Sequence, residues 1–172
     1  CLEQAGVRLR PDGAIEVDTF SQTSAPPIYA VGDETGSTAV TPVAIREGAA
    51  VAETLFNDNP IAVDHSLIGS AVFGEPEVAA IGLTEDEALT HGDIDVYVAR
   101  FRPMMNSLSN NPARMMLKLV TLAETGKVLG THVLGPGAAE MIQLAAVAMG
   151  MGATKSDFDR AVALHPTAGD GL

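Results

Sequence analysis

The sequence predicts an α+β fold: an antiparallel sheet with helices in residues 67–172, preceded in residues 1–66 by a strand-and-helix piece of an α/β domain. In the second part, short β-prone runs are interrupted by helical segments without the regular strand and helix alternation of a parallel sheet. Two of these runs flank a turn and predict a hairpin. The breaker cluster Asn57-Asp58-Asn59-Pro60 separates the two parts.

The first part is expected to begin with a turn and two short strands. Pro11-Asp12-Gly13 has the composition of a turn, and the alternating residues 14–17 predict a strand behind it. Residues 28–31 are an apolar, β-prone run that ends in Gly32-Asp33. This run predicts a buried strand that places the Asp33 carboxylate at the edge of a sheet.

A helix is expected from residue 42 to about residue 56, with Thr41 as its N-cap and Pro42 as its first helical residue. The N-terminus of such a helix carries unpaired N–H groups and a partial positive charge. Together with the Asp33 carboxylate, it suits a polyol joined to an electron-rich ring or an anion. An ordinary strand, loop and helix would show the same pattern.

The second part is expected to hold strands and helices in mixed order. The strands are predicted at residues 71–73, 78–82, 96–102, 114–122 and 128–134, and the helices at residues 84–90, 138–149 and 156–162. The last two strands are joined across Glu124-Thr125-Gly126-Lys127, which is the hairpin. The Asn- and Ser-rich residues 106–111 are expected to form a loop.

The helix at residues 138–149 is apolar over most of its circumference, which indicates burial on more than one side. It is either a core helix or a contact surface for a second subunit, for which its small and adaptable side chains are suited. The apolar residues are Met141, Ile142, Leu144, Ala145, Val147, Ala148 and Met149.

Composition and charge argue against several classes of function. The 172 residues carry a formal net charge of −12, which disfavours nucleic acid because Lys and Arg must neutralise its phosphates. No run of about 18 apolar residues is present, so we expect no membrane span or membrane partner and a cytoplasmic protein. His65, His91 and His132 lack metal-ligand spacing, and no metal site is expected.

The last eight residues indicate acid–base chemistry, because His165 and Asp170 stand five residues apart across a Pro-containing turn. Histidine titrates near neutral pH, and a neighbouring carboxylate can fix its tautomer and stabilise its protonated form. By itself such a segment is more often a surface turn. The two residues are nevertheless the candidate catalytic pair of this chain.

Several motifs together resemble the C-terminal part of the flavoprotein disulfide reductases, most of all the glutathione reductase branch. The resemblance runs through nearly the whole chain and implies that residues 1–66 are the C-terminal remnant of an FAD-binding domain and residues 67–172 the dimerisation domain. The motifs are Ile28-Tyr29-Ala30-Val31-Gly32-Asp33, Thr41-Pro42-Val43-Ala44-Ile45-Arg46-Glu47-Gly48, Ile81-Gly82-Leu83-Thr84-Glu85, Phe101-Arg102-Pro103-Met104, Val128-Leu129-Gly130-Thr131-His132, Gly152-Ala153-Thr154-Lys155-Ser156-Asp157-Phe158-Asp159 and His165-Pro166-Thr167.

The resemblance implies FAD and NADPH as cofactors, glutathione disulfide as substrate, and a homodimer whose active sites draw on both subunits. Asp33 would hydrogen-bond the ribityl chain of FAD, and Thr41 with the start of its helix would face the pyrimidine end of the flavin. His165 would reach into the partner's site and protonate the departing glutathione thiolate. Asp170 stands where the family has the glutamate that orients this histidine.

The chain departs from the family pattern at its site residues. Asp170 is one methylene shorter than glutamate, so its carboxylate would fall short of the imidazole if the backbone is unchanged. Ala49 stands where some glutathione reductases have an arginine, which makes glutathione specificity less secure. Arg46, Arg100 and Arg102 are candidate cations for an anionic substrate, although solvated surface charge is the preferred interpretation of all three.

Other parts of the family's machinery are absent from this sequence. It contains no Gly-x-Gly-x-x-Gly fingerprint, and its single cysteine, Cys1, cannot form an intramolecular redox disulfide. We therefore expect the C-terminal portion of a longer reductase, cut at Cys1 and inactive alone. Two alternatives stay open: a stand-alone dimerisation module without chemistry, and a disulfide reductase of the dihydrolipoamide or mercuric type.

Overall fold

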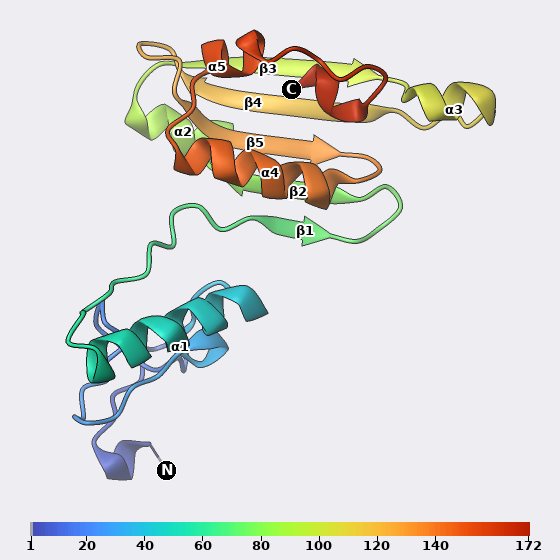
Figure 1. Cartoon of the computed structure of the whole chain (residues 1–172). Helices are drawn as coiled ribbons and strands as arrows, with labels where there is room; N and C mark the ends of the chain where they lie inside the picture. The colour runs from blue at the N-terminus through green and yellow to red at the C-terminus, as the bar shows by residue number, and fades with distance from the viewer. Residues whose placement is uncertain (1) are drawn as a thin grey trace. The chain divides into compact units, whose positions relative to one another are not determined.

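The second part of the chain is built on a five-stranded antiparallel sheet with the strand order β1-β2-β5-β4-β3 (Figure 1). The computed structural model describes residues 2–172. The α+β class with an antiparallel sheet is confirmed, and each strand overlaps its predicted range. The strands are β1 (Ser70–Val72), β2 (Val78–Gly82), β3 (Ile94–Phe101), β4 (Met115–Leu122) and β5 (Val128–Leu134).

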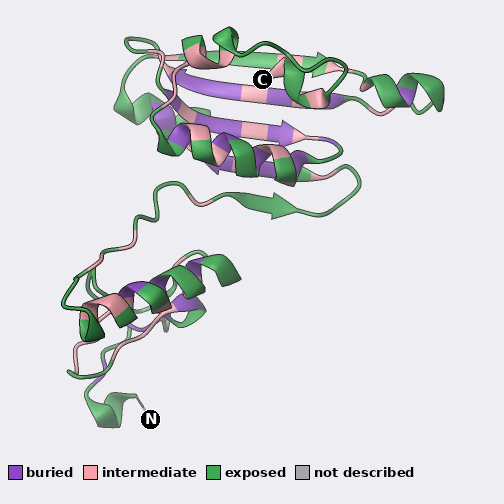
Figure 2. Ribbon diagram, in the orientation of Figure 1, coloured by how far each residue is buried: buried purple, intermediate pink, exposed green. Residues whose placement is uncertain are grey.

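The predicted hairpin joins β4 to β5. Its turn is closed by two backbone hydrogen bonds, from Gly126 N–H to Leu122 O (2.7 Å) and from Leu122 N–H to Lys127 O (2.9 Å). Gly126 has φ +70°, a left-handed conformation that glycine adopts at little cost. The hairpin pairs two largely buried strands at the centre of the sheet (Figure 2).

Helix α4 (Ala138–Gly150) packs on this sheet and completes the hydrophobic core. Its buried residues Ile142 and Met149 meet side chains of β2, β4 and β5. On its other side, Leu144 is 72% and Val147 58% exposed. Within the described chain, α4 is therefore buried on the side that faces the sheet, while the side with Leu144 and Val147 is exposed.

The shorter helices are partly those expected. Helix α2 (Glu85–Ala88), which continues as η3 (Leu89–His91), and helix α5 (Lys155–Arg160) lie in predicted helical ranges. Helix α3 (Met104–Leu108) overlaps the predicted loop at residues 106–111. It is held by polar contacts: Arg102 Nη2 donates to Asn106 O (2.6 Å), and the buried Asn106 side chain donates to Ala113 O (3.0 Å). These contacts form only when the ends of β3 and β4 come together, so the composition of residues 106–111 could not predict the helix.

The first part contains helix α1 (Thr41–Phe56), as predicted, and the 3-10 turns η1 (Glu3–Ala5) and η2 (Gly32–Thr35). Thr41 is not the N-cap of α1: Val40 occupies that position with extended backbone angles, and its carbonyl accepts the N–H of Val43 (3.0 Å). Thr41 is instead the first helical residue. No side chain caps this end of the helix.

The two strands predicted in the first part do not form a sheet. Residues 14–17 and 28–31 make only isolated bridges, and Ile28 is 37% exposed rather than buried. A strand needs a neighbouring strand for its backbone hydrogen bonds, and the described residues before Ser66 supply no more than these bridges. The bridges are Leu9 with Ile15, Val17 with Thr23 and Gln22 with Tyr29.

The chain divides into two compact units, one ending at His65 and the other running from Ser66 to Leu172. None of the helices formed by residues 2–172 has the length and apolar character that crossing a membrane requires. Cys1, the expected cut point without a disulfide partner, lies outside the described residues.

Candidate functional site

His165 and Asp170 lie together in the second unit. The Nδ1 atom of His165 is 3.1 Å from the Oδ2 atom of Asp170. The 3-10 turn η4 (Ala168–Gly171) folds the chain back, and the Asp170 carboxylate reaches the imidazole. The expectation that this side chain would be too short is therefore not met. The His165 side chain is 72% exposed and that of Asp170 is 24% exposed. Because Nδ1 faces the carboxylate, Nε2 is the ring nitrogen left to exchange a proton with a substrate.

An open cleft of about 300 Å³ adjoins this pair. Its wall includes His165 and Asp170, Phe101 at the end of β3, and Met104 and Met105 of α3. The cleft is mainly apolar, which is typical of sites that bind small molecules and orient them with a few polar groups. Strand β3, helix α3 and the end of the chain, distant in sequence, thus meet around the candidate acid–base pair.

Of the three arginines considered as partners for an anionic substrate, Arg102 lines this cleft. Its guanidinium is not simply solvated, since it donates to the backbone carbonyls of Asn106 (2.6 Å) and Asn111 (2.9 Å). Arg46 and Arg100 are exposed, as surface charge would be. Arg102 therefore both holds the α3 segment and brings positive charge to the cleft.

Asp33 and Thr41 lie in the first unit, on η2 and at the start of α1. The Asp33 side chain is exposed and makes no hydrogen bond or ion pair with any described residue, so its carboxylate is open to a ligand. The start of α1 has no side-chain cap, so its partial positive charge is also uncompensated. No hydrogen bond among the described residues joins Asp33 directly to Thr41.

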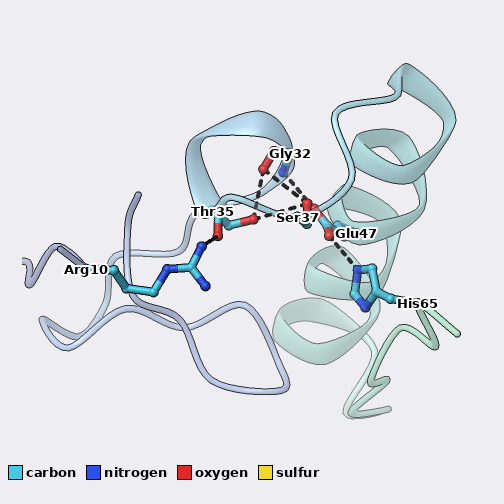
Figure 3. Close-up of polar contacts among 6 residues, drawn as sticks. All are labelled: Arg10, Gly32, Thr35, Ser37, Glu47 and His65. Carbon is cyan, nitrogen blue, oxygen red and sulfur yellow. Dashed lines mark hydrogen bonds and ion pairs between the residues drawn. The ribbon is translucent and has the colours of Figure 1, made fainter. Parts of the chain in front are cut away.

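The sequence-based prediction omits a buried carboxylate, Glu47 of α1, which accepts a hydrogen bond from Gly32, the residue before Asp33. Glu47 is 4% exposed. Its Oε2 atom accepts the N–H of Gly32 at 2.6 Å, and its Oε1 atom is 2.7 Å from Nε2 of His65 (Figure 3). Nearby, Thr35 Oγ1 donates to Gly32 O (2.8 Å) and Arg10 Nη2 donates to Thr35 O (2.6 Å).

The environment of Glu47 keeps it ionised. Burial by itself would raise the pKa of this carboxyl, but the Gly32 N–H and the His65 ring, with a contribution from Ser37, outweigh it and lower the pKa below its ordinary value of 4.5. A signal for this burial exists in the sequence. Val43, Glu47 and Ala50 have the i, i+4, i+7 spacing of one helix face, and all three are buried.

His132 is half-buried on β5, with its Nε2 atom 3.1 Å from the Leu83 carbonyl oxygen. Burial lowers its pKa, while the Leu83 carbonyl and two glutamates, Glu85 and Glu87, oppose that shift. No group of three or more His, Cys, Asp or Glu side chains in residues 2–172 is placed to hold a metal ion.

Comparison with known proteins identifies related chains. The chain is 50% identical over 170 residues to the chloroplastic/mitochondrial glutathione reductase of Pisum sativum, covering 98% of this chain and 31% of that protein. It is 48% identical to a glutathione reductase of Nostoc sp. (91% of this chain, 35% of that protein) and 42% identical to a trypanothione reductase of Leishmania donovani (99% and 35%). The chain thus spans about a third of the length of these curated relatives.

A solved structure has the same fold. The HOCl-induced flavoprotein disulfide reductase RclA from Escherichia coli superposes with a TM-score of 0.86 at 26% identity, covering 98% of this chain and 39% of that one. Residues 1–48 match the pyridine nucleotide-disulphide oxidoreductases, and residues 68–172 match the dimerisation domain of that family. The resemblance inferred from the sequence is confirmed, and the chain belongs to the pyridine nucleotide-disulphide oxidoreductase family, of which residues 68–172 are the dimerisation domain.

Proposed function

We propose that this chain is the C-terminal, FAD-contacting and dimerising part of an NADPH- and FAD-dependent glutathione-disulfide reductase, and that it supplies His165 to the active site of the partner subunit. The observation that carries the proposal is the 3.1 Å pairing of His165 with Asp170 at a cleft, in a chain about half identical to glutathione reductases. An acid–base pair of this kind suits the protonation of a leaving thiolate.

The residues of the first unit fit a flavin. The Asp33 carboxylate has no partner among the described residues and can accept hydrogen bonds from ribityl hydroxyls. The uncapped start of α1 at Thr41 favours negative charge, as on the pyrimidine end of a reduced flavin. When bound, FAD would carry electrons from NADPH toward the disulfide.

His165 would act through its Nε2 atom. In the protonated imidazole, Nδ1–H donates to Asp170 and Nε2–H is free to give its proton to the sulfur of the departing glutathione thiolate. The neutral ring that remains keeps its Nδ1–H directed at the carboxylate, which fixes the tautomer. Asp170 therefore orients His165.

A homodimer is the expected assembly, because the site would be completed by the partner's His165. Support comes from the exposed apolar side of α4, where Leu144 and Val147 are 72% and 58% exposed, and from its C-cap Met151, which is 83% exposed. Val162 and Leu164, just before His165, are 97% and 75% exposed. Apolar side chains gathered in this way are typical of subunit contacts.

The test is steady-state kinetics of the complete protein with NADPH. We expect reduction of glutathione disulfide, and a fall in kcat of about 10²- to 10⁴-fold in His165→Ala. The matched control is His91→Ala, which removes an exposed histidine of η3. Failure to reduce glutathione disulfide, or an active His165→Ala variant, would contradict the proposal.

Trypanothione disulfide is a second candidate substrate, favoured by the 42% identity to the Leishmania donovani trypanothione reductase and by Ala49 where some glutathione reductases have arginine. The kcat/KM values of the complete protein for glutathione disulfide, trypanothione disulfide and lipoamide separate these substrate classes.

The chain of 172 residues alone is expected not to oxidise NADPH, and disulfide-dependent oxidation by the pure chain would disprove that expectation.

A further inference from the structure

We propose that Glu47 is a positioning residue for the flavin: its buried carboxylate ties the Gly32–Asp33 turn to helix α1, and His65 holds that carboxylate from its other side. The inference rests on the proposed function, in which Asp33 and the start of α1 contact FAD. It concerns a side chain that touches neither the substrate nor the reacting atoms.

The orientation of the Glu47 carboxylate is set by its two oxygens. Oε2 accepts the Gly32 N–H at 2.6 Å, and Oε1 faces Nε2 of His65 at 2.7 Å (Figure 3). The two partners come from different segments, 15 and 18 residues away along the chain. A buried, ionised acceptor makes strong hydrogen bonds, so the carboxylate resists rotation.

The turn that Glu47 holds is constrained on both sides of the Gly32 residue. The N–H of Gly32 donates to Glu47, and the carbonyl of Gly32 accepts from Thr35 Oγ1 at 2.8 Å. Gly32 has φ +76°, and a Cβ at this position would lie 3.0 Å from the Cβ of Ala44 on α1. The absence of a side chain therefore lets the backbone approach the helix closely enough to reach Glu47.

This contact has a consequence for the neighbouring residue. Asp33 follows Gly32 directly, so fixing the Gly32 N–H fixes the start of the Asp33 backbone. The same helix carries Thr41 at its first position and Glu47 six residues later. Glu47 therefore sets the position of the Asp33 turn relative to the start of α1. Two flavin contacts need such support, because a site loses its function when its groups are displaced by about 0.5 Å.

The experiment is a double-mutant cycle on the complete protein, purified with FAD. FAD release is followed by the rise in fluorescence of free FAD after dilution, a readout independent of turnover. Asp33→Ala defines the effect of losing the ribityl contact. Glu47→Ala is expected to accelerate release about 10- to 100-fold, since a hydrogen bond to a charged group is lost. In Asp33→Ala/Glu47→Ala, release is expected to be no faster than in the faster single variant, because Glu47 acts through Asp33.

Conservative variants separate positioning from general stability. Glu47→Gln keeps an acceptor for the Gly32 N–H, and its FAD release should stay within about twofold of the unsubstituted protein. Glu34→Ala removes an exposed acidic side chain from the same turn and should leave release unchanged. If Glu47→Ala does not fold, His65→Ala takes its place in the cycle, with a smaller acceleration that is again not additive with Asp33→Ala.

The outcomes distinguish the two proposals. If Asp33→Ala releases FAD no faster than the unsubstituted protein, the flavin contact proposed for Asp33 is wrong, and the role of Glu47 falls with it. If Asp33→Ala accelerates release but the effects of Glu47→Ala or His65→Ala add to it, only the positioning role is overturned. Release from Glu47→Gln as fast as from Glu47→Ala would overturn it too.

Discussion

Asp170 lies within 3.1 Å of His165 Nδ1 although an aspartate is shorter than the glutamate that the family resemblance leads one to expect. Asp170 lies on η4 (Ala168–Gly171), a tight 3-10 turn that brings its carboxylate to the ring. The side chain and its turn therefore have to be considered together.

Asp170→Asn should lower kcat for disulfide reduction by about 10²-fold in the complete protein, because an amide can also donate to Nδ1 and no longer fixes one tautomer of the ring. Steady-state kinetics with saturating NADPH measure the change. Asp170→Glu is the matched variant and should retain activity within a few-fold, since it keeps the charge. Equal activity of the unsubstituted protein and Asp170→Asn would mean that the 3.1 Å contact has no role in orienting His165.

Glu47→Gln should reduce stability near neutral pH but not in acid. The pKa of Glu47 is lower in the folded chain than its ordinary value of 4.5, so the unfolded chain binds the proton more readily. The stabilisation is present above about pH 4.5 and is lost as the pH falls through the folded-state pKa. Urea unfolding followed by circular dichroism should give a difference of about 1 kcal/mol at pH 7. A stability difference between the two proteins that grows as the pH falls would contradict this prediction. Glu34→Gln, which replaces an exposed glutamate, serves as the control.

Leu144→Asp together with Val147→Asp should convert the proposed homodimer to monomer. Both side chains lie on the exposed side of α4. If this side forms the subunit contact, the two new carboxylates of each subunit would lose their water there, which destabilises the dimer. Light scattering with size-exclusion chromatography measures the mass. The control is Phe56→Asp, which replaces the last residue of α1, a side chain that is 81% exposed. This variant should remain dimeric. A doubly substituted protein that stays dimeric would exclude this side of α4 from the contact.

Ile142→Ala should lower the free energy of unfolding by about 2–5 kcal/mol, because the side chain is 3% exposed in the core against the sheet and its removal leaves a cavity. Gln143→Ala, at the neighbouring exposed position of the same helix, should change it by less than about 0.5 kcal/mol. Urea unfolding of both variants tests the packing of α4. Similar losses for the two would show that the helix packs on another face.

The five strands of the sheet and the hairpin could be predicted because their signals lie between neighbours in the chain. The apolar runs that became β2 and β5 and the turn around Gly126 all carry local signals. His165 and Asp170 could be predicted as a pair for the same reason, since they are five residues apart. Glu47 could not be recognised by its chemistry, since Gly32 and His65 approach it only once the chain has folded.

By itself, the sequence determined the fold class, the five strands of the antiparallel sheet, the family and the two residues of the candidate acid–base pair. Tertiary structure alone decided that residues 28–31 make one bridge instead of a strand, that Val40 rather than Thr41 precedes α1, and that an Asn- and Ser-rich segment forms part of α3. It also decided which apolar side of α4 is buried and which groups contact the Glu47 carboxylate. The physical reason is the same in each case: periodicity and turn chemistry act between near neighbours, whereas hydrogen-bond partners and burial depend on segments that only folding brings together.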